Sequence, residues 1–358
     1  MKRIKLNALF VALIAVAFLS SCHKDKVDPN KGNSTATRAG IYVMNQGGFQ
    51  ANNSTLTYYD FDTKNLTADL YASANGSGLG DTGNDAQIYG SKMYIVVNFS
   101  SVLDVVNAKT GKLIKSISML NSGVKREPRS VAFDKGNAFI TSYDGTVAVL
   151  DTATLGITKY INVGRNPEQL VVSNGKLYVA NSGGLSFGNP DNTVSVIDLN
   201  SLTETKKITV RANPISVAAD TYGHVYVLSA GDFADIQPGM TIIDNTTDVA
   251  STPTTLSLGY NIPMAASGDF VYYPTADNKI ALFNAKTQTA GATNFISDGT
   301  VLISPYAISV DNQSGEVFVT DAKDYSSNGT LYAFDKTGKM EYSFTTGINP
   351  GKITLLNK

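Results

Sequence analysis

Few residues in this sequence have the types needed for catalysis or tight metal binding. The 358-residue chain has two histidines, His23 and His224, and a single cysteine, Cys22. His224 lies in a predicted turn, where a histidine is most simply solvated. Without a histidine cluster or further thiols, zinc sites and most nucleophile–base pairs lack their parts. We therefore expect no catalytic residue, no metal site and no cofactor, and we expect that the protein is not an enzyme.

The acidic residues offer an alternative to that expectation. The segment Asp81-Thr82-Gly83-Asn84-Asp85 supplies oxygens that would suit calcium, but it lacks the spacing of an EF-hand loop. A plain Asx or Gly turn is the simpler interpretation. A lactonase or another hydrolase would instead need several aspartates to converge in space. The candidates for such a cluster are Asp81, Asp85, Asp232, Asp235, Asp321 and Asp324.

Loop-like polar segments are a more informative source of candidates. Four long segments each place one aromatic residue among Asn, Asp and Gly. They are residues 45–50, 182–192, 231–238 and 321–329. Rigid aromatics beside adaptable polar groups are typical of binding surfaces. Five shorter segments mostly place Arg or Tyr beside Asn. These segments end near residues 127, 166, 213, 261 and 349. Such pairs could present convergent donors to an amide- or phosphate-bearing ligand.

Twelve residues from these segments are the candidate ligand-binding set. They are Phe49, Arg126, Arg165, Asn166, Phe187, Asn189, Arg211, Asn213, Phe233, Tyr260, Tyr325 and Asn349. Each has a structural alternative, because Asn before Pro is also a common turn former. The hypothesis therefore concerns the surface as a whole more than any single side chain.

A repeated unit of strands must position these segments. An aromatic or apolar pair recurs seven times, at Tyr42-Val43, Tyr94-Ile95, Phe139-Ile140, Tyr178-Val179, Tyr226-Val227, Val271-Tyr272 and Phe318-Val319. A second strand follows each pair and ends in Asp or Asn, at Asp60, Asn107, Asp151, Asp198, Asp244, Asn284 and Asp335. Successive members of the second series lie 40 to 51 residues apart. A fixed period of about 40–50 residues with several short strands is typical of propeller blades.

One repeat can be divided into four strands. Pro167 opens the first, residues 169–172, because Pro lacks a ladder donor and suits the start of a strand. Residues 176–181, 193–198 and 204–210 are the other three. The Asp or Asn that ends each third strand can accept hydrogen bonds from its own turn, which explains its recurrence without catalysis.

The two ends of the repeat array complete one another. The first repeat lacks a first strand, and residues 349–356 resemble a first strand with nothing after it. We predict an all-β, seven-bladed β-propeller of four-stranded blades, closed by pairing of the C-terminal strand with the N-terminal blade. Six or eight blades are the alternatives. The candidate residues would then share one face, around the mouth of the central channel.

The first 22 residues are typical of a targeting segment. Lys2, Arg3 and Lys5 precede the apolar run 6–19, and Leu19-Ser20-Ser21-Cys22 resembles a bacterial lipobox. An ordinary secretory signal is the alternative. We expect a lipoprotein signal peptide over 1–21, lipidation of Cys22 and a flexible tether over 22–38. The propeller would occupy 39–358.

Charge and composition exclude some functions. Without Lys2, Arg3 and Lys5 the formal charge falls from −1 to −4, so the body has no electrostatic footprint for nucleic acid. The chain has no Trp, which argues against quinoprotein dehydrogenases.

The repeat also carries a family resemblance. Three four-residue segments resemble the repeat of the YVTN-family (YncE-like) propellers. They are Tyr178-Val179-Ala180-Asn181, Phe318-Val319-Thr320-Asp321 and Tyr42-Val43-Met44-Asn45. With the lipobox, the chain resembles YncE-like surface lipoproteins of Bacteroidota, which include BtuG-type cobalamin-binding proteins. The resemblance implies an outer-membrane lipoprotein at the cell surface, with the periplasmic face as the alternative. It also implies capture of a nutrient, a cobalamin-like corrinoid, for a TonB-dependent transporter, with the membrane contacted through the lipid anchor only. A protein- or glycan-interaction module without a transport role is the alternative function.

Overall fold

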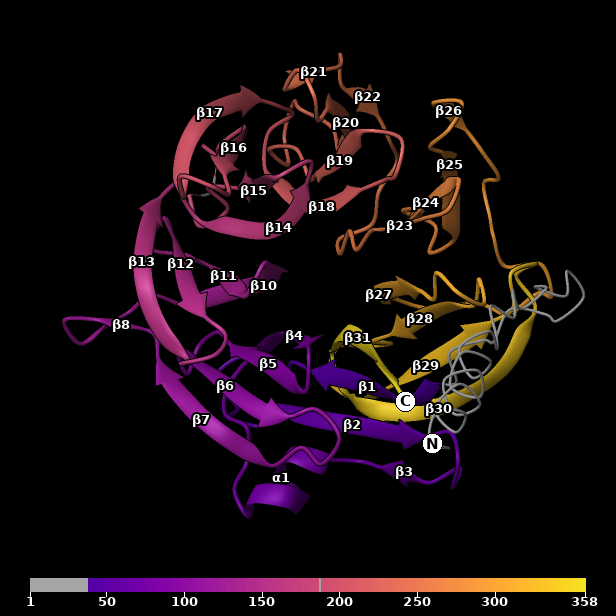
Figure 1. The fold of residues 1–358 in the computed structure, drawn as a ribbon. Coiled ribbons are helices and arrows are strands. Elements are labelled where there is room, and N and C mark those ends of the chain that lie inside the picture. Colours follow the sequence, from indigo (N-terminus) through magenta and orange to yellow (C-terminus); the bar gives the residue numbers. More distant parts are fainter. Residues whose placement is uncertain (1–37, 187) are drawn as a thin grey trace, which may run out of the picture. The chain divides into compact units, whose positions relative to one another are not determined.

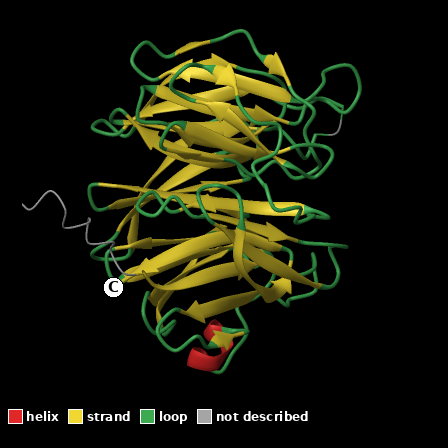
Figure 2. Ribbon diagram, turned by 90° about the vertical axis from the view of Figure 1, so that its right-hand side faces the viewer, coloured by secondary structure: helices red, strands yellow, loops and turns green. Residues whose placement is uncertain are grey.

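The computed structural model describes residues 38–186 and 188–358. The expected signal peptide, the lipidation residue Cys22 and the candidate Phe187 lie outside the described residues. The compact unit Ala36–Lys358 holds the repeats. Its described regular structure consists of β-strands and one short helix, α1 (Leu70–Asn75), at the outer edge (Figure 2). None of the described helices is long and apolar enough to cross a membrane.

Seven four-stranded antiparallel sheets form the blades of a propeller (Figure 1). From the innermost strand outward, blade 1 is β31 (Pro350–Asn357), β1 (Arg38–Asn45), β2 (Thr55–Asp60) and β3 (Leu66–Thr67). Blade 2 is β4 (Gly83–Tyr89), β5 (Lys92–Val97), β6 (Val102–Asn107) and β7 (Leu113–Ser118). Blade 3 is β10 (Pro128–Asp134), β11 (Asn137–Ser142), β12 (Thr146–Asp151) and β13 (Gly156–Asn162). Blade 4 is β14 (Pro167–Ser173), β15 (Lys176–Asn181), β16 (Thr193–Asp198) and β17 (Thr203–Thr209).

The outer strand is short in blades 5 and 6 and long in blade 7. Blade 5 is β18 (Pro214–Ala219), β19 (His224–Ser229), β20 (Gly239–Asp244) and β21 (Val249–Ala250), with β22 (Thr254–Thr255) also paired to β20. Blade 6 is β23 (Ala265–Ser267), β24 (Phe270–Pro274), β25 (Ile280–Asn284) and β26 (Thr289–Ala290). Blade 7 is β27 (Pro305–Val310), β28 (Val317–Asp321), β29 (Asn328–Phe334) and β30 (Met340–Ile348). A two-stranded hairpin, β8 (Leu120–Asn121) and β9 (Val124–Lys125), projects between blades 2 and 3 (Figure 1).

The ring closes as the sequence predicts. β31 pairs antiparallel with β1, and the indigo first strand lies beside the yellow last strand in Figure 1. The first strand begins at Arg38, one residue before the predicted start of the propeller. Arg38 forms ion pairs with Asp311 and Glu316 of blade 7, which fix the beginning of β1.

The core lies between the blades. Seven hydrophobic clusters each combine residues of two neighbouring blades, one for each of the seven interfaces of a closed ring. Neighbouring strand residues point to opposite sides of a sheet. Tyr42 accordingly packs toward blade 2, and Val43 packs toward blade 7. This arrangement explains the recurring pair in the second strand, because both of its members are buried.

The recurring Asp or Asn has the structural role expected of it. In all seven blades its Oδ1 accepts backbone N–H bonds from the turn that follows, as Asp198 does from Asn200 (3.1 Å) and Ser201 (2.8 Å). The tight turn between β14 and β15 is also as predicted: Asn174 and Gly175 have φ of 49° and 70°. Asn and Gly are favoured there because they tolerate positive φ.

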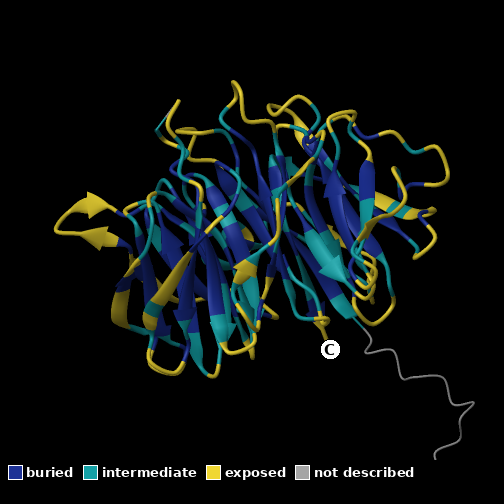
Figure 3. Cartoon of the chain, turned by 90° about the horizontal axis from the view of Figure 1, so that it is seen from above, coloured by how far each residue is buried: buried dark blue, intermediate teal, exposed yellow. Residues whose placement is uncertain are grey.

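The long loops gather on one face of the ring. The connections from the second to the third strand of a blade, and from the fourth strand to the next blade, all emerge there (Figure 3). We call this side the loop face. The turns between first and second strands lie on the opposite side.

Candidate functional site

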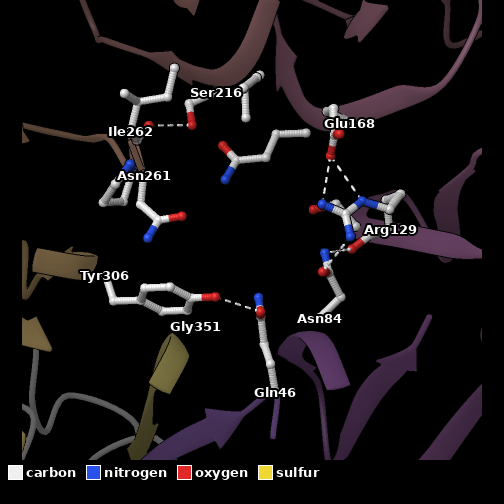
Figure 4. Close-up of a pocket in the computed structure, with 13 residues that line it drawn as sticks. Gln46, Asn84, Arg129, Glu168, Ser216, Asn261, Ile262, Tyr306 and Gly351 are labelled. Carbon is white, nitrogen blue, oxygen red and sulfur yellow. Dashed lines mark hydrogen bonds and ion pairs between the residues drawn. The ribbon is translucent and has the colours of Figure 1, made fainter. Parts of the chain in front are cut away.

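A cavity of about 130 Å³ lies where the inner strands begin, at the centre of the loop face (Figure 4). Every blade contributes to it. The lining residues are Gln46, Asn84, Arg129, Ser130, Glu168, Gln169, Ile215, Ser216, Asn261, Ile262, Pro263, Tyr306 and Gly351. We call this cavity the channel mouth. Its wall is mostly polar side chains, which the inner strands hold at the axis of the ring.

Proline sets these side chains in place. Five of the lining residues directly follow the proline that begins an inner strand. They are Arg129, Glu168, Ile215, Tyr306 and Gly351. The residue before four of these prolines has a positive φ: Glu127 (55°), Asn166 (44°), Asn213 (58°) and Asn349 (52°). The chain therefore turns sharply onto the inner strand, and the residue after the proline reaches the channel mouth.

An ion pair between blades 3 and 4 dominates one side of the channel mouth. The Arg129 guanidinium lies against the Glu168 carboxylate, with Nε and Nη2 at 2.9 and 2.8 Å from Oε2. Nη1 donates to Asn84 Oδ1 at 2.6 Å, and Asn84 Nδ2 donates back to the Arg129 carbonyl at 2.5 Å. Figure 4 shows these three side chains converging. Both charges are neutralised where they meet the cavity.

Tyr143 completes this network from the blade 3 loop. Its hydroxyl donates to Glu168 Oε1 at 2.6 Å, and the Arg129 guanidinium lies 4.7 Å from its ring centroid. Burial, opposed by the nearby Arg129 charge and helped by Glu168, raises the pKa of Tyr143 far above its usual value. Burial would lower the pKa of Arg129, but the charge and hydrogen bond of Glu168, together with Tyr143 and Tyr306, outweigh burial and raise that pKa. Tyr143 thus stays a neutral donor and Arg129 a cation.

The opposite side of the channel mouth is neutral and aromatic. The Tyr306 hydroxyl donates to Gln46 Oε1 at 2.7 Å, and the rings of Tyr306 and Tyr325 meet edge to face at 6.0 Å. Asn261 Nδ2 lies 3.5 Å from the Tyr325 hydroxyl. Burial raises the pKa of Tyr306 to about 12. This side therefore offers amides and phenols rather than charges.

Four of the predicted aromatics are exposed on the loop face. Tyr260 is 83% exposed, Phe233 71%, Phe49 69% and Tyr325 42%. Tyr325 reaches the channel mouth through its contact with Tyr306, while Phe49 packs edge to face on Phe99 at 4.9 Å. The structure thus brings Tyr325 to the cavity and leaves the other three on the surrounding rim.

The predicted arginines are held by partners of their own. Arg126 is buried, pairs with Asp144, and stacks 4.0 Å from the centroid of Tyr160. Arg165 pairs with Asp191. It also donates to Ser186 Oγ (3.0 Å) and the Asn189 carbonyl (3.1 Å), so it fastens the long loop of blade 4. Arg211 donates to the Gln237 carbonyl and, at 3.0 Å, to Thr255 Oγ1.

The predicted asparagines act mainly through the backbone. Asn166 and Asn213 adopt the positive φ before proline, and their backbone groups bind neighbouring loops. Asn349 does the same, and its Nδ2 donates to the Gly47 carbonyl at 2.9 Å. The backbone carbonyl of Asn189 accepts a hydrogen bond from Arg165.

The aspartates weighed for calcium or catalysis hold local structure. Asp81 accepts the backbone N–H groups of Gln50 (3.1 Å) and Asn52 (3.3 Å), so the segment that begins with it orders the blade 1 loop. Asp321 similarly accepts from Ile303 and Ser304, both at 2.8 Å. Over residues 38–186 and 188–358, no group of three or more His, Cys, Asp or Glu could hold a metal ion.

His224 differs from its predicted solvated state. It begins β19 and is only partly exposed, and its Nδ1 lies 2.9 Å from Asp220 Oδ2. Asp220 also accepts from the Tyr226 hydroxyl at 2.7 Å. The tight connection between β18 and β19 brings the aspartate back over the imidazole, on the side of the ring opposite the loop face.

Sequence reasoning missed most of the channel mouth. Of its lining residues, none was among the twelve candidates, although Asn84 was considered as part of a calcium-binding segment. A usable signal was present, because the residue after the proline lines the cavity in five of the seven blades. Those positions carry Arg, Glu, Tyr, Ile and Gly, so they do not form a recognisable motif.

Comparisons with known proteins give a family and a fold. The family described as "Domain of unknown function (DUF5074)" matches residues 39–349. No curated protein matches the chain. A quinonprotein alcohol dehydrogenase-like protein from Bacteroides thetaiotaomicron is similar in structure, at 20% identity and a TM-score of 0.64. The similarity covers 91% of this chain and 80% of that protein.

More distant structures share the same architecture. A hypothetical selenium-binding protein from Sulfolobus tokodaii is similar with a TM-score of 0.65 at 11% identity, over 89% of this chain and 93% of that one. Hydrazine synthase from Kuenenia stuttgartiensis has a TM-score of 0.60 at 13% identity, over 77% and 95%. At these identities the similarity shows the fold alone.

Proposed function

The chain belongs to the DUF5074 family, and from the geometry of its channel mouth we propose that it is a ligand-binding propeller that captures a small molecule on the loop face. One observation carries the proposal: all seven blades direct residues to a single polar cavity, and exposed aromatics surround it. Convergent polar groups inside a ring of rigid aromatics are typical of ligand sites.

The size of the cavity indicates how a ligand would sit. About 130 Å³ holds roughly four water molecules, so only a small group of a ligand enters. The body of the ligand would rest on the loop face, against Tyr260, Tyr325 and Phe49. A large ligand with short polar substituents fits this division better than a small metabolite.

Cobalamin is the ligand that we propose to test first. The resemblance to YncE-like and BtuG-type lipoproteins suggests it, and a corrinoid has a broad body with short carboxamide side chains. In this proposal Cys22 carries the lipid anchor at the outer membrane, and a TonB-dependent transporter receives the ligand. The role is binding without turnover, which agrees with the local structural use of Asp81 and Asp321.

The test is a calorimetric titration of the protein with cyanocobalamin. We expect saturable binding with one site. Absence of heat, together with an unchanged unfolding temperature, would remove the corrinoid and leave the ligand to be found by screening other neutral compounds.

A protein-interaction role is the second candidate, and the β8–β9 hairpin favours it. The hairpin projects outward from the ring (Figures 1 and 3), and Leu120 and Val124 expose apolar side chains on it. Exposed apolar side chains that protrude from a fold often mark a partner surface. If this role is correct, Leu120→Ser with Val124→Ser abolishes capture of an outer-membrane protein in a pull-down without ligand. Unchanged capture would argue against it.

A further inference from the structure

We infer that Glu168 sets the charge class of the ligand: by neutralising Arg129 it makes the channel mouth select an uncharged polar group, a carboxamide or a hydroxyl, over an anion. The inference rests on the proposed function in that it takes the channel mouth as the ligand site. It identifies Glu168 as a residue that determines ligand specificity. It also gives the chemical class of the ligand group that enters the channel mouth.

The geometry of the ion pair supports this role. Among the described residues, Arg129 is the one arginine that lines the cavity, and alone it would attract carboxylates or phosphates. Glu168 Oε2 instead accepts from Nε of Arg129 and lies 2.8 Å from Nη2, and Asn84 Oδ1 accepts from Nη1. The Nε–Nη2 side, by which an arginine grips an anion in a bidentate pair, is therefore occupied by a carboxylate of the protein itself.

Glu168 is itself held in position from a third side. Its Oε1 accepts the Tyr143 hydroxyl at 2.6 Å, so the carboxylate cannot rotate away without losing that bond. An incoming anion would have to displace a buried carboxylate that is fixed by two partners. That displacement costs more than an exposed surface pair would, because the cavity shields the charges less from one another than bulk water does.

The hydrogen-bonding groups left for a ligand are neutral. Gln46 uses Oε1 to accept from Tyr306, and Gln169 uses Oε1 to accept from the Val217 backbone N–H at 3.3 Å. Within the described residues neither Nε2 group has a hydrogen-bond partner. Together with Asn261 they offer donors and an acceptor of the carboxamide type, which match a carboxamide or a hydroxyl group.

The experiment measures whether removal of the Glu168 charge creates an anion site. Inorganic phosphate is titrated into the wild-type protein and the Glu168→Gln variant, followed by calorimetry and by the unfolding temperature against sodium chloride of equal ionic strength. We expect no specific binding to wild type. In Glu168→Gln we expect phosphate to bind at least about tenfold more tightly, since the Arg129 charge is then uncompensated.

Two controls make the result specific to the cavity. The double variant Glu168→Gln with Arg129→Gln removes both charges and should lose the gained affinity. Asp144→Asn frees Arg126, an arginine outside the cavity and packed on Tyr160, and should gain none. Equal gains in Asp144→Asn and Glu168→Gln would overturn the inference.

The wild-type protein and Arg129→Gln test the inference if Glu168→Gln fails to fold. Phosphate binding to wild type that Arg129→Gln abolishes would show that the channel mouth already accepts anions, and would overturn the inference. Phosphate probes the charge of the channel mouth whatever ligand fills it. A negative cyanocobalamin titration, which bears on the proposed function, therefore leaves this result standing.

Discussion

Val43 of β1 and Ile353 of β31 are register partners, so strands from the two ends of the chain are neighbours in blade 1. Both side chains are buried in the cluster that joins blade 1 to blade 7. The inner strand of the blade is thus supplied by the C-terminal segment. The stability of the ring therefore depends on a contact between the first and the last strand of the array.

Ile353→Ala should therefore destabilise the protein as a core substitution does. Loss of a buried isoleucine side chain typically costs about 2–5 kcal/mol of unfolding free energy. Urea unfolding followed by circular dichroism measures it. The matched control is Ile114→Ala on the exposed edge of blade 2, which should change stability by no more than about 0.5 kcal/mol. Equal effects of both variants would contradict a closure role for β31.

Asp198→Ala should lower the unfolding temperature at pH 7 more than Asp198→Asn does. The alanine cannot accept the N–H bonds of Asn200 and Ser201, but an asparagine can, as Asn107 does in blade 2. Thermal unfolding of both variants checks this. Equal losses in the two variants would show that the carboxylate charge, and not the acceptance of hydrogen bonds, stabilises the turn.

The same turns predict an acid dependence. Backbone N–H donors hold the pKa of Asp60, Asp151, Asp198 and Asp244 below its usual value. An aspartate whose pKa is lower in the folded than in the unfolded protein stabilises the fold above the unfolded-state pKa of about 3.9. This stabilisation is lost as the pH falls through the folded-state pKa. We expect the unfolding temperature to drop below about pH 4, and to drop less in Asp198→Asn. Equal acid sensitivity of wild type and variant would contradict the assignment.

Arg165→Ala should loosen the blade 4 loop without unfolding the propeller. The guanidinium is half-exposed, and exposed ion pairs contribute about 0–1 kcal/mol. Limited proteolysis should cut faster within residues 183–192, where Arg165 contacts Ser186, Asn189 and Asp191. The unfolding temperature serves as the control. Unchanged cleavage would mean that other contacts hold the loop.

Tyr325→Ala should weaken ligand binding, and a matched tyrosine on the opposite side provides the control. Tyr325 is 42% exposed beside the channel mouth, and Tyr222 is 43% exposed in the turn between β18 and β19. Truncating an aromatic anchor in a binding site typically costs 1 kcal/mol or more, about a fivefold or larger loss of affinity. Calorimetry should find that loss for Tyr325→Ala and none for Tyr222→Ala. Equal losses would place the ligand elsewhere or make the effect non-specific.

Much of the fold could be predicted from the sequence because its signals are local and repeated. The buried pair Tyr178-Val179 and the turn residue Asp198 recur in each blade, since every blade packs on two neighbours and must turn in the same way. Closure was predictable because the first repeat lacked one strand and the last segment supplied it.

The site was harder to predict because its parts lie far apart in the sequence. Arg129 and Glu168 meet through the packing of two blades, and no local pattern relates them. The pairing of Arg165 with Asp191 likewise uses a conspicuous arginine for structure rather than for a ligand. The exposed aromatics Phe49, Phe233 and Tyr260 were predictable, since loop residues of that type have little else to pack against.

The most direct test of a binding site at the channel mouth is hydrogen–deuterium exchange with and without cyanocobalamin. We expect slower exchange in residues 45–50, 259–263 and 321–329, which surround the cavity on the loop face. We expect no change in the turns of the opposite side, such as residues 220–223. Protection confined to those turns, or absent from the loop face while the ligand is bound, would contradict a binding site at the channel mouth.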